Sequence, residues 1–211
     1  MSTRKIIDTP WNTISIIPCL VNKGVTTVIR YYGMDSHVHP EKVLKFDEAK
    51  ALSNAGLKIA VVFEMINNAP EYFSYDLGLK HAHIAFKLAK AINQPINSAI
   101  YFAVDFDAND DEINKSIIPH FNGIKDGLNE ASNGQSSYKI GIYGSGKVIN
   151  TIKTDYRWLS ESMGWSQSRK ALSDGDYELC QYPGSSDFCW NDANKFDFNS
   201  KKTETTDIGA F

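Results

Sequence analysis

Strand-like and helix-like segments alternate along this chain of 211 residues, and that alternation limits the possible folds more than any other feature. Short runs rich in β-branched and aromatic residues predict eight strands. They lie at 6–8, 26–32, 57–65, 98–106, 138–143, 156–159, 177–182 and 196–198. Segments with helical spacing separate the first five strands, at 13–22, 42–54, 75–92 and 111–131, whereas later helices are short.

Such alternation favours an α/β fold with a mostly parallel sheet. Eight successive strands predict a (β/α)8 barrel of the TIM type with reduced C-terminal helices, near the short end of the lengths known for that fold. No repeat, low-complexity tract or shift in composition marks a linker. We therefore predict a single domain over residues 1–211.

The fourth predicted strand contains an unbroken apolar run followed by two acids, Asp105 and Asp107. A run of this kind is typical of a strand buried on both faces. Residues two apart in a strand share a face, so both carboxylates are expected to point the same way. The alternative is that the pair caps the helix that follows.

In a barrel, the carboxyl ends of all strands face one pocket. The residues there form a ring of acids interleaved with aromatic and amide side chains. Asp8, Glu64, Asp105 and Asp107 are the candidate catalytic residues. The candidate substrate-binding residues are Arg30, Tyr32, Tyr101, Tyr143, Trp158, Gln181, Asp197 and Asn199.

This mixture suits a sugar-processing site. Aromatic rings stack on the apolar faces of sugars, and glycoside hydrolysis commonly uses two carboxyl groups flanking the scissile bond. One carboxyl must stay protonated near neutral pH, through burial or a neighbouring like charge. For Arg30 the alternative is a structural ion pair with Glu64 or Asp8, and the aromatic residues are alternatively core or rim residues.

Composition argues against several other classes of function. A net charge of −3 with scattered lysines gives no reason to expect a nucleic-acid partner, and no segment is long and apolar enough for a membrane span. No convincing ligand set predicts a metal, and no motif predicts a cofactor. His37 and His39 beside Asp35 are the weak exception, and such a loop is more often simply solvated.

The three cysteines are Cys19, Cys180 and Cys189. Their odd number and the absence of a C-x-x-C pair argue against a disulfide framework. A bridge between Cys180 and Cys189 would close a short loop, but a reducing compartment without disulfides is the simpler expectation. The N-terminus lacks the apolar core of a secretory signal, so the chain is expected to be made in the cytoplasm and to reach a cell wall only through another export route.

Several short segments carry a resemblance that covers nearly the whole chain. They are 7–9, 28–32, 48–52, 55–57, 100–107, 140–144 and 197–199. With these segments the chain resembles the glycoside-hydrolase-like barrels of the domain-of-unknown-function 1906 family, the Rv2525c-like proteins, which are relatives of the family 25 lysozymes. The resemblance implies a barrel whose pocket binds amino-sugar glycans, with peptidoglycan as the expected polymer.

The lysozyme relatives carry an Asp-x-Glu pair at the end of the fourth strand. The resemblance therefore implies that Asp105 orients the N-acetyl group of the substrate and that Asp107 is the general acid. Asp107 is one methylene shorter than glutamate, and a loss of reach of about 1 Å can cost roughly a hundredfold in rate. Two interpretations follow: Glu64 supplies the acid, or the protein binds glycans without cleaving them.

The leading hypothesis is a peptidoglycan hydrolase of the muramidase type. Without a signal peptide it would fit a lysin released by a phage, or an antibacterial effector with a delivery or immunity protein as partner. The alternative is a non-catalytic cell-wall glycan-binding barrel. A stem-peptide amidase is a weaker option, because it normally needs zinc.

Overall fold

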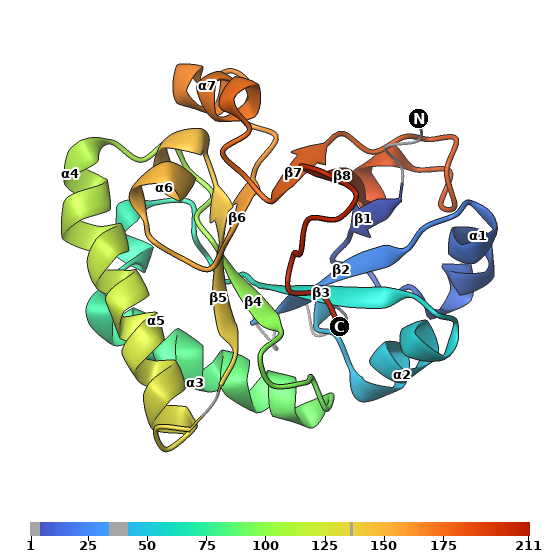
Figure 1. The fold of residues 1–211 in the computed structure, drawn as a ribbon, viewed down its shortest axis with the longest axis horizontal. Coiled ribbons are helices and arrows are strands. Elements are labelled where there is room, and N and C mark those ends of the chain that lie inside the picture. Colours follow the sequence, from blue (N-terminus) through green and yellow to red (C-terminus); the bar gives the residue numbers. More distant parts are fainter. Residues whose placement is uncertain (1–4, 34–41, 136) are drawn as a thin grey trace.

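Eight strands close into a barrel in the computed structural model, which describes residues 5–33, 42–135 and 137–211 (Figure 1). The strands pair in the order of the sequence. They are β1 (Ile6–Asp8), β2 (Thr27–Tyr32), β3 (Lys58–Phe63), β4 (Ala99–Ala103), β5 (Lys139–Gly144), β6 (Tyr156–Leu159), β7 (Leu179–Tyr182) and β8 (Asp197–Lys201). The predicted α/β barrel is confirmed, and each predicted strand lies within a few residues of an observed one.

The direction of the last strand differs from the prediction. Strands β1 to β7 pair in parallel, whereas β8 runs antiparallel to both of its neighbours, β7 and β1. An antiparallel strand begins where its parallel neighbours end. The first residue of β8, rather than its last, therefore lies at the carboxyl-end face of the barrel.

Helices connect the strands and cover the outside of the barrel. They are α1 (Ile17–Asn22), α2 (Phe46–Asn54), α3 (Tyr75–Ala91), α4 (Asp110–Glu112), α5 (Ile118–Ala131), α6 (Gly146–Thr151) and α7 (Ser166–Asp174). The short 3-10 turns are η1 (Ile14–Ile16), η3 (Pro70–Tyr72) and η5 (Ala193–Lys195), and the π-helical turn η4 (Ile113–Ile117) joins α4 to α5. The prediction of short late helices holds, although the nine-residue helix α7 was not expected.

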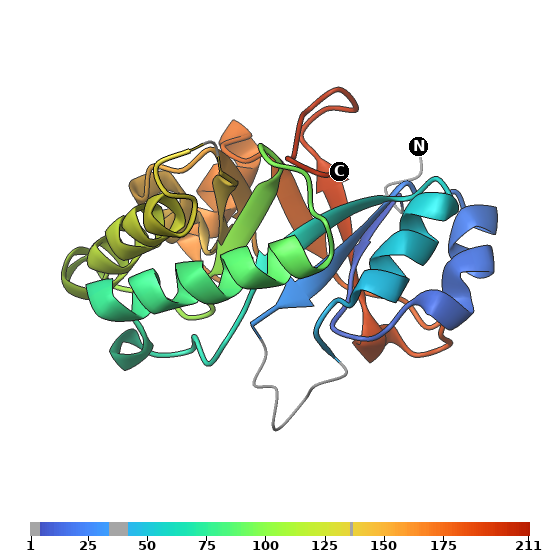
Figure 2. The same cartoon turned by 90° about the horizontal axis from the view of Figure 1, so that it is seen from below.

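The two longest helices, α3 and α5, lie side by side on one flank of the barrel, and α1 and α2 lie on the opposite flank (Figure 2). Glycines permit the close approach of α3 and α5. A Cβ on Gly78 would collide with the His120 carbonyl, and one on Gly123 would collide with the Tyr75 carbonyl.

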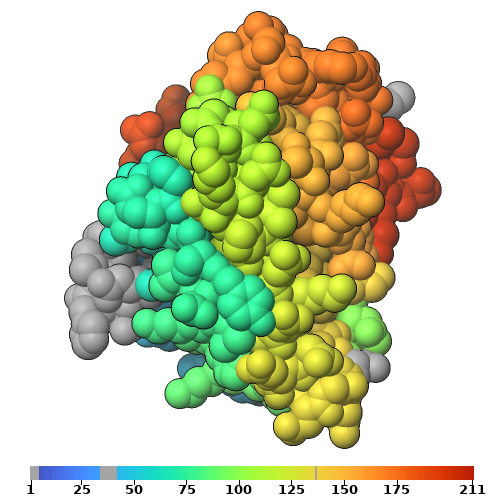
Figure 3. Space-filling view, turned by 90° about the vertical axis from the view of Figure 1, so that its left-hand side faces the viewer, coloured from blue at the N-terminus to red at the C-terminus, as the bar shows by residue number. Residues whose placement is uncertain are grey.

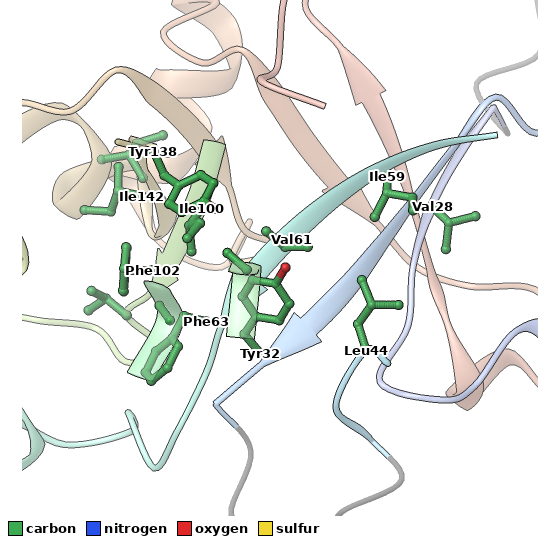
Figure 4. Close-up of a cluster of buried hydrophobic side chains, with 14 of the residues drawn as sticks. Val28, Tyr32, Leu44, Ile59, Val61, Phe63, Ile100, Phe102, Tyr138 and Ile142 are labelled. Atoms are coloured by element: carbon green, nitrogen blue, oxygen red, sulfur yellow. The ribbon is translucent and has the colours of Figure 1, made fainter. Parts of the chain in front are cut away.

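The main hydrophobic core lies between the strands and these helices (Figure 4). Alternate residues of each strand point outward into it, as period-two side-chain geometry requires. Val28, Ile59, Val61, Ile100 and Phe102 are among the buried members.

A second, smaller cluster fills the barrel interior with the intervening residues, among them Ile29, Val62 and Tyr101. The C-terminal segment completes it, since Ile208 is buried there and its carbonyl accepts a hydrogen bond of 3.0 Å from the Tyr101 hydroxyl. Gly141 on β5 leaves room for the Tyr101 ring, because any Cβ at this position would collide with that ring.

The expectation of no disulfide is wrong, and so is the alternative pairing of Cys180 with Cys189. Cys19, in α1, and Cys189, in the segment between β7 and β8, form a disulfide across 170 positions, with Cα atoms 5.8 Å apart. Cys180 points into the core as a buried free thiol. Sequence spacing offered only the nearer pair as an alternative, whereas barrel closure brings the two ends of the chain together.

Among the described residues, no helix combines the length and the apolar character needed to cross a membrane.

Candidate active site

Polar side chains gather at the face of the barrel where the parallel strands end. Because alternate strand residues point inward, the last inward position of each strand borders this opening. We call the following residues the mouth cluster: Asp8, Tyr31, Glu64, Asp105, Tyr143, Gln181 and Asp197.

Asp8, the last residue of β1, lies deepest in the mouth cluster and is 1% exposed. Its carboxylate accepts hydrogen bonds from the Tyr31 hydroxyl at 3.1 Å, from the Gln181 amide at 3.2 and 3.3 Å, and from the Asn199 amide at 2.7 Å. These donors come from β2, β7 and β8, so the carboxylate ties three strands together.

The pKa of Asp8 is raised from 3.8 to about 7. Burial is the main cause, and the negative charge of Asp197 adds to it, while the hydrogen bonds from Asn199, Gln181 and Tyr31 act in the opposite direction. Asp8 therefore exchanges between its neutral and charged forms near neutral pH.

Gln181 links Asp8 and Asp197 to the rest of the mouth cluster. Its amide nitrogen donates to Asp8 and, at 3.3 Å, to Asp197. Its carbonyl oxygen accepts from the Tyr143 hydroxyl at 2.9 Å and from the Glu161 backbone N–H at 3.3 Å. The prediction that these strand ends converge is met at Gln181, Tyr143 and Asp197.

Asp197 reaches the mouth cluster because β8 is antiparallel. It is the first residue of β8 and lies opposite Asp8 in the register. Burial raises its pKa, and a hydrogen bond of 3.2 Å from the Gly184 backbone N–H opposes that rise. Asn199 lies two residues deeper, fully buried, where its amide supports Asp8 and its oxygen has no hydrogen-bond partner.

Glu64 and Asp105 form the other side of the mouth cluster. Glu64 directly follows β3 and is half-buried. Burial, and then the charge of Asp105, raise its pKa from 4.5 to about 7, with the Lys42 ammonium acting against them. Burial also raises the pKa of Asp105. A carboxylic acid that is protonated near neutrality thus stands beside a second acid.

Asp107 does not share the face of Asp105, contrary to the prediction. Strand β4 ends at Ala103, and although Asp105 still donates its N–H to the Asn67 carbonyl at 3.1 Å, the chain then turns, with Ala108 N–H bonded to the Phe106 carbonyl at 3.0 Å. The period of two therefore ends before Asp107. Its side chain is exposed and lines a separate outer groove with Ser145 and Trp165.

The alternative role of the pair as a helix cap is also wrong. Asn109 caps α4 through a reciprocal capping box, in which its side chain accepts from the Glu112 N–H at 3.0 Å and the Glu112 carboxylate accepts from the Asn109 N–H at 2.8 Å.

Arg30 and Tyr32 point away from the mouth, so their predicted placement is corrected. Arg30 is fully buried in the outer layer, where it binds both carboxylate oxygens of Glu48 on α2, at 2.7 and 3.0 Å. The Tyr32 hydroxyl donates to Gln94 at 2.9 Å. Both residues are on the outward face of β2, and the intervening Tyr31 takes the place expected of Tyr32 in the mouth.

Tyr101 and Trp158 face the interior but lie below the mouth, among the side chains that fill the barrel. Trp158 packs edge-on against Tyr143, with ring centroids 4.7 Å apart, and against Tyr101 at 5.7 Å. Both are buried, at 1% and 0% exposure. They support the Tyr143 ring from beneath and are not available to a ligand at the surface.

Four residues near the mouth were not predicted as site residues: Tyr31, Lys42, Glu161 and Trp11. Tyr31 was detectable, because Asp8 pairs with Ile29 in a parallel register and the next inward residue of β2 is Tyr31. Lys42 interacts with Glu64 and lies 5.7 Å from the Trp11 ring centroid. The positions of Lys42, Glu161 and Trp11 depend on loop paths, for which the sequence carries no periodic signal.

In the described part of the chain, no three His, Cys, Asp or Glu side chains are grouped as metal ligands. His37 and His39, the weak metal candidates of the sequence, lie outside the described residues.

A closed α/β barrel with acids, tyrosines and an amide around its mouth defines a glycoside-hydrolase-like protein. Residues 18–207 match the family described as Rv2525c-like, glycoside hydrolase-like domain, and the chain belongs to that family. The *Bacillus subtilis* protein FadG is 38% identical over 135 residues, and YbfG of the same strain is 34% identical over 132. These matches cover 63% and 59% of this chain but only 23% and 18% of those longer proteins.

Solved structures share the fold. The Tat-secreted protein Rv2525c of *Mycobacterium tuberculosis* superposes with a TM-score of 0.76 at 20% identity, covering 99% of each chain. The modular autolysin LytC of *Streptococcus pneumoniae*, also solved with a synthetic peptidoglycan ligand, superposes with a TM-score of 0.56 at 15% identity. That match covers 93% of this chain and 46% of LytC. The barrel fold is thus shared with a modular autolysin.

Proposed function

We propose that this chain cleaves the glycan strand of peptidoglycan at the mouth cluster, as a glycoside hydrolase of the muramidase type. The observation that carries the proposal is the pair formed by Glu64 and Asp105. A carboxyl with a pKa of about 7 donates a proton efficiently near neutral pH, and a neighbouring acid is needed to handle the charge that develops on the sugar.

In this mechanism, Glu64 protonates the oxygen of the scissile glycosidic bond as that bond breaks. The carbonyl oxygen of the substrate N-acetyl group forms the new bond to the anomeric carbon, and Asp105 accepts a hydrogen bond from the acetamido N–H, as the family resemblance implies. The Glu64 carboxylate then takes a proton from a water molecule, which opens the cyclic intermediate and restores the acid. The protons and bonds balance without a cofactor.

The remaining mouth residues hold and orient the sugar. Asp8 is buried and already accepts hydrogen bonds from Tyr31, Gln181 and Asn199, so it acts as a fixed acceptor beneath the ligand. The Tyr31 and Tyr143 rings add surface suited to the apolar face of a sugar.

The fold shared with LytC, which was solved with a synthetic peptidoglycan ligand, supports peptidoglycan as the substrate class. The Cys19–Cys189 disulfide supports action outside the cytoplasm, because disulfides persist in oxidising compartments. We propose the cell wall as the place of action. Export by a phage or a secretion system, with a delivery or immunity partner, stays a prediction.

The decisive test is the release of reducing ends from purified peptidoglycan. We expect wild-type protein to release them and Glu64→Gln to release them about 10²–10⁴-fold more slowly, while Glu71→Gln, on an exposed residue of η3, retains wild-type activity. Intact glycan strands after incubation with excess wild-type protein would contradict the hydrolase proposal.

A glycan-binding barrel without turnover is the second candidate, and the position of Asp107 favours it. The residue that the resemblance equates with the lysozyme general acid lies in the outer groove instead of the mouth cluster. This candidate predicts saturable binding of peptidoglycan fragments without release of reducing ends, and the same assay paired with a binding isotherm separates the two.

A further inference from the structure

A second hollow lies beside the mouth, on the face formed by α4, α6 and α7, which adjoin in the space-filling view where yellow-green meets orange (Figure 3). Its volume is about 860 Å³, within the range of ligand-binding pockets. Exposed amide and hydroxyl groups line it, from Asn150, Thr151, Ser166 and Gln167, together with the partly exposed ring of Trp165. We call this hollow the outer groove.

The charges of the outer groove cancel. Two acids, Asp107 and Asp110, face two bases, Lys147 and Arg169. The Lys147 ammonium pairs with Asp110 at 2.9 Å, and the Arg169 guanidinium donates to the carbonyls of Met163 and Gly164 at 2.9 and 2.8 Å. Because two acids balance two bases, the groove suits a neutral polar ligand better than a phosphate or a carboxylate.

At the ends of β4, β5 and β6, three short chain segments link the mouth cluster to the outer groove. The loop after β4 places Asp105 at the mouth and Asp107 in the groove. At the end of β5, Tyr143 lies at the mouth, and Ser145, the N-cap of α6, lines the groove.

In the loop after β6, the Glu161 backbone N–H donates to Gln181 of the mouth, and Trp165 lies in the groove. Each segment thus has one residue at the mouth and another, shortly after it in the sequence, in the groove. A linear polymer that enters the mouth can follow all three.

We propose that the outer groove binds further sugar units of the same glycan strand, with the Trp165 ring as a stacking surface and Asp107 as an acceptor for sugar hydroxyl or acetamido N–H groups. The inference rests on the proposed glycan function and extends it: the protein recognises a strand of several sugars. It also gives Asp107 a binding role in place of proton transfer.

The test measures affinity as a function of ligand length. Oligosaccharides of alternating N-acetylglucosamine and N-acetylmuramic acid, with two, four and six sugars, are titrated by calorimetry in the Glu64→Gln background to prevent turnover. We expect affinity to rise with length. Trp165→Ala should weaken binding of the hexasaccharide about tenfold and leave the disaccharide unchanged.

Phe46→Ala is the matched control, since Phe46 is an exposed aromatic residue, 42% accessible, on α2 at the opposite flank. Gln167→Ala, at an exposed groove position, is a milder second variant that keeps the test valid if Trp165→Ala fails to fold. Its expected effect is a smaller loss confined to the longer ligands.

The outcomes separate the two proposals. If the disaccharide binds but affinity neither rises with length nor depends on Trp165 or Gln167, the outer groove proposal is overturned and the mouth proposal stands. An equal loss for all lengths would place Trp165 at the mouth and also overturn it. If none of the ligands binds the Glu64→Gln protein, the proposed function itself fails.

Discussion

The two sides of the mouth cluster have the same acidity but differ in their hydrogen bonds. Asp8 and Glu64 both have a pKa of about 7, with burial as the first cause and a neighbouring aspartate as the second. Asp8, however, is saturated by hydrogen bonds from three strands, whereas no described side chain donates one to Glu64. The Asp8 side is a rigid support, and the Glu64 side retains a carboxyl that can give its proton to a ligand.

The largest expected effect comes from removing the available acid. Glu64→Gln should lower turnover about 10²–10⁴-fold, the usual contribution of a positioned general acid. Thermal unfolding should change little at acidic pH, where the native carboxyl is also neutral. Reducing-end release and calorimetry on the same sample check both parts. Full activity in Glu64→Gln would assign the acid to another carboxyl.

The Asp8 side of the mouth cluster depends on the disulfide between Cys19 and Cys189. The segment that carries Cys189 also carries Gly184, whose N–H binds Asp197. Cys19→Ser should lower the free energy of unfolding by about 2–5 kcal/mol.

Chemical denaturation with and without reductant measures that loss. Reduction of the wild type should reproduce the loss of stability seen in Cys19→Ser. Cys180→Ser should lose as much stability on reduction as the wild type does, since Cys180 is a free thiol. A Cys19→Ser variant as stable as the oxidised wild type would show that the link does not constrain this side.

Asp8 and its neighbours predict a pH-dependent stability. A folded-state pKa raised from 3.8 to about 7 makes ionisation in the fold unfavourable. The contribution of Asp8 is therefore complete below pH 4 and is lost as the pH rises towards and through 7. Asp8→Asn removes this penalty, so it should gain stability relative to wild type between pH 4 and pH 8, by up to ~4 kcal/mol.

The unpaired Asn199 oxygen offers the new amide an acceptor after rotation of the Asn199 side chain. Denaturant unfolding at pH 4 and at pH 8 checks the prediction. If the stability difference between Asp8→Asn and wild type is the same at both pH values, burial does not raise the pKa of Asp8.

The smallest effect is expected from the charge next to Glu64. Activity should fall as the pH rises through about 7, because Glu64 then loses its proton. Asp105 raises the pKa of Glu64, so Asp105→Asn should move this alkaline limb to lower pH, besides lowering the rate. A pH–rate profile of kcat/KM measures the shift, and Asp126→Asn on the far helix α5 serves as control. If the alkaline limb of Asp105→Asn does not move, Asp105 does not raise the pKa of Glu64.

Much of the site could be predicted from the sequence because strands have a simple period. Asp8, Glu64 and Asp105 follow apolar runs, and parallel strands deliver their ends to one face. The same logic failed at Arg30 and Tyr32, where a shift of one residue reverses the side of the sheet. It failed at Asp107 because β4 ends earlier than its apolar run indicates, and a turn is not periodic.

The sequence by itself determined the number and order of the strands, the barrel class and the family, since these depend on local hydrophobic patterns and short motifs. The tertiary structure decided the direction of β8, which brings Asp197 to the mouth by its first residue, and the pairing of Cys19 with Cys189. It also decided which carboxyl groups have a raised pKa. Strand direction, long-range pairing and burial depend on which distant segments meet, and no local pattern of residues records that.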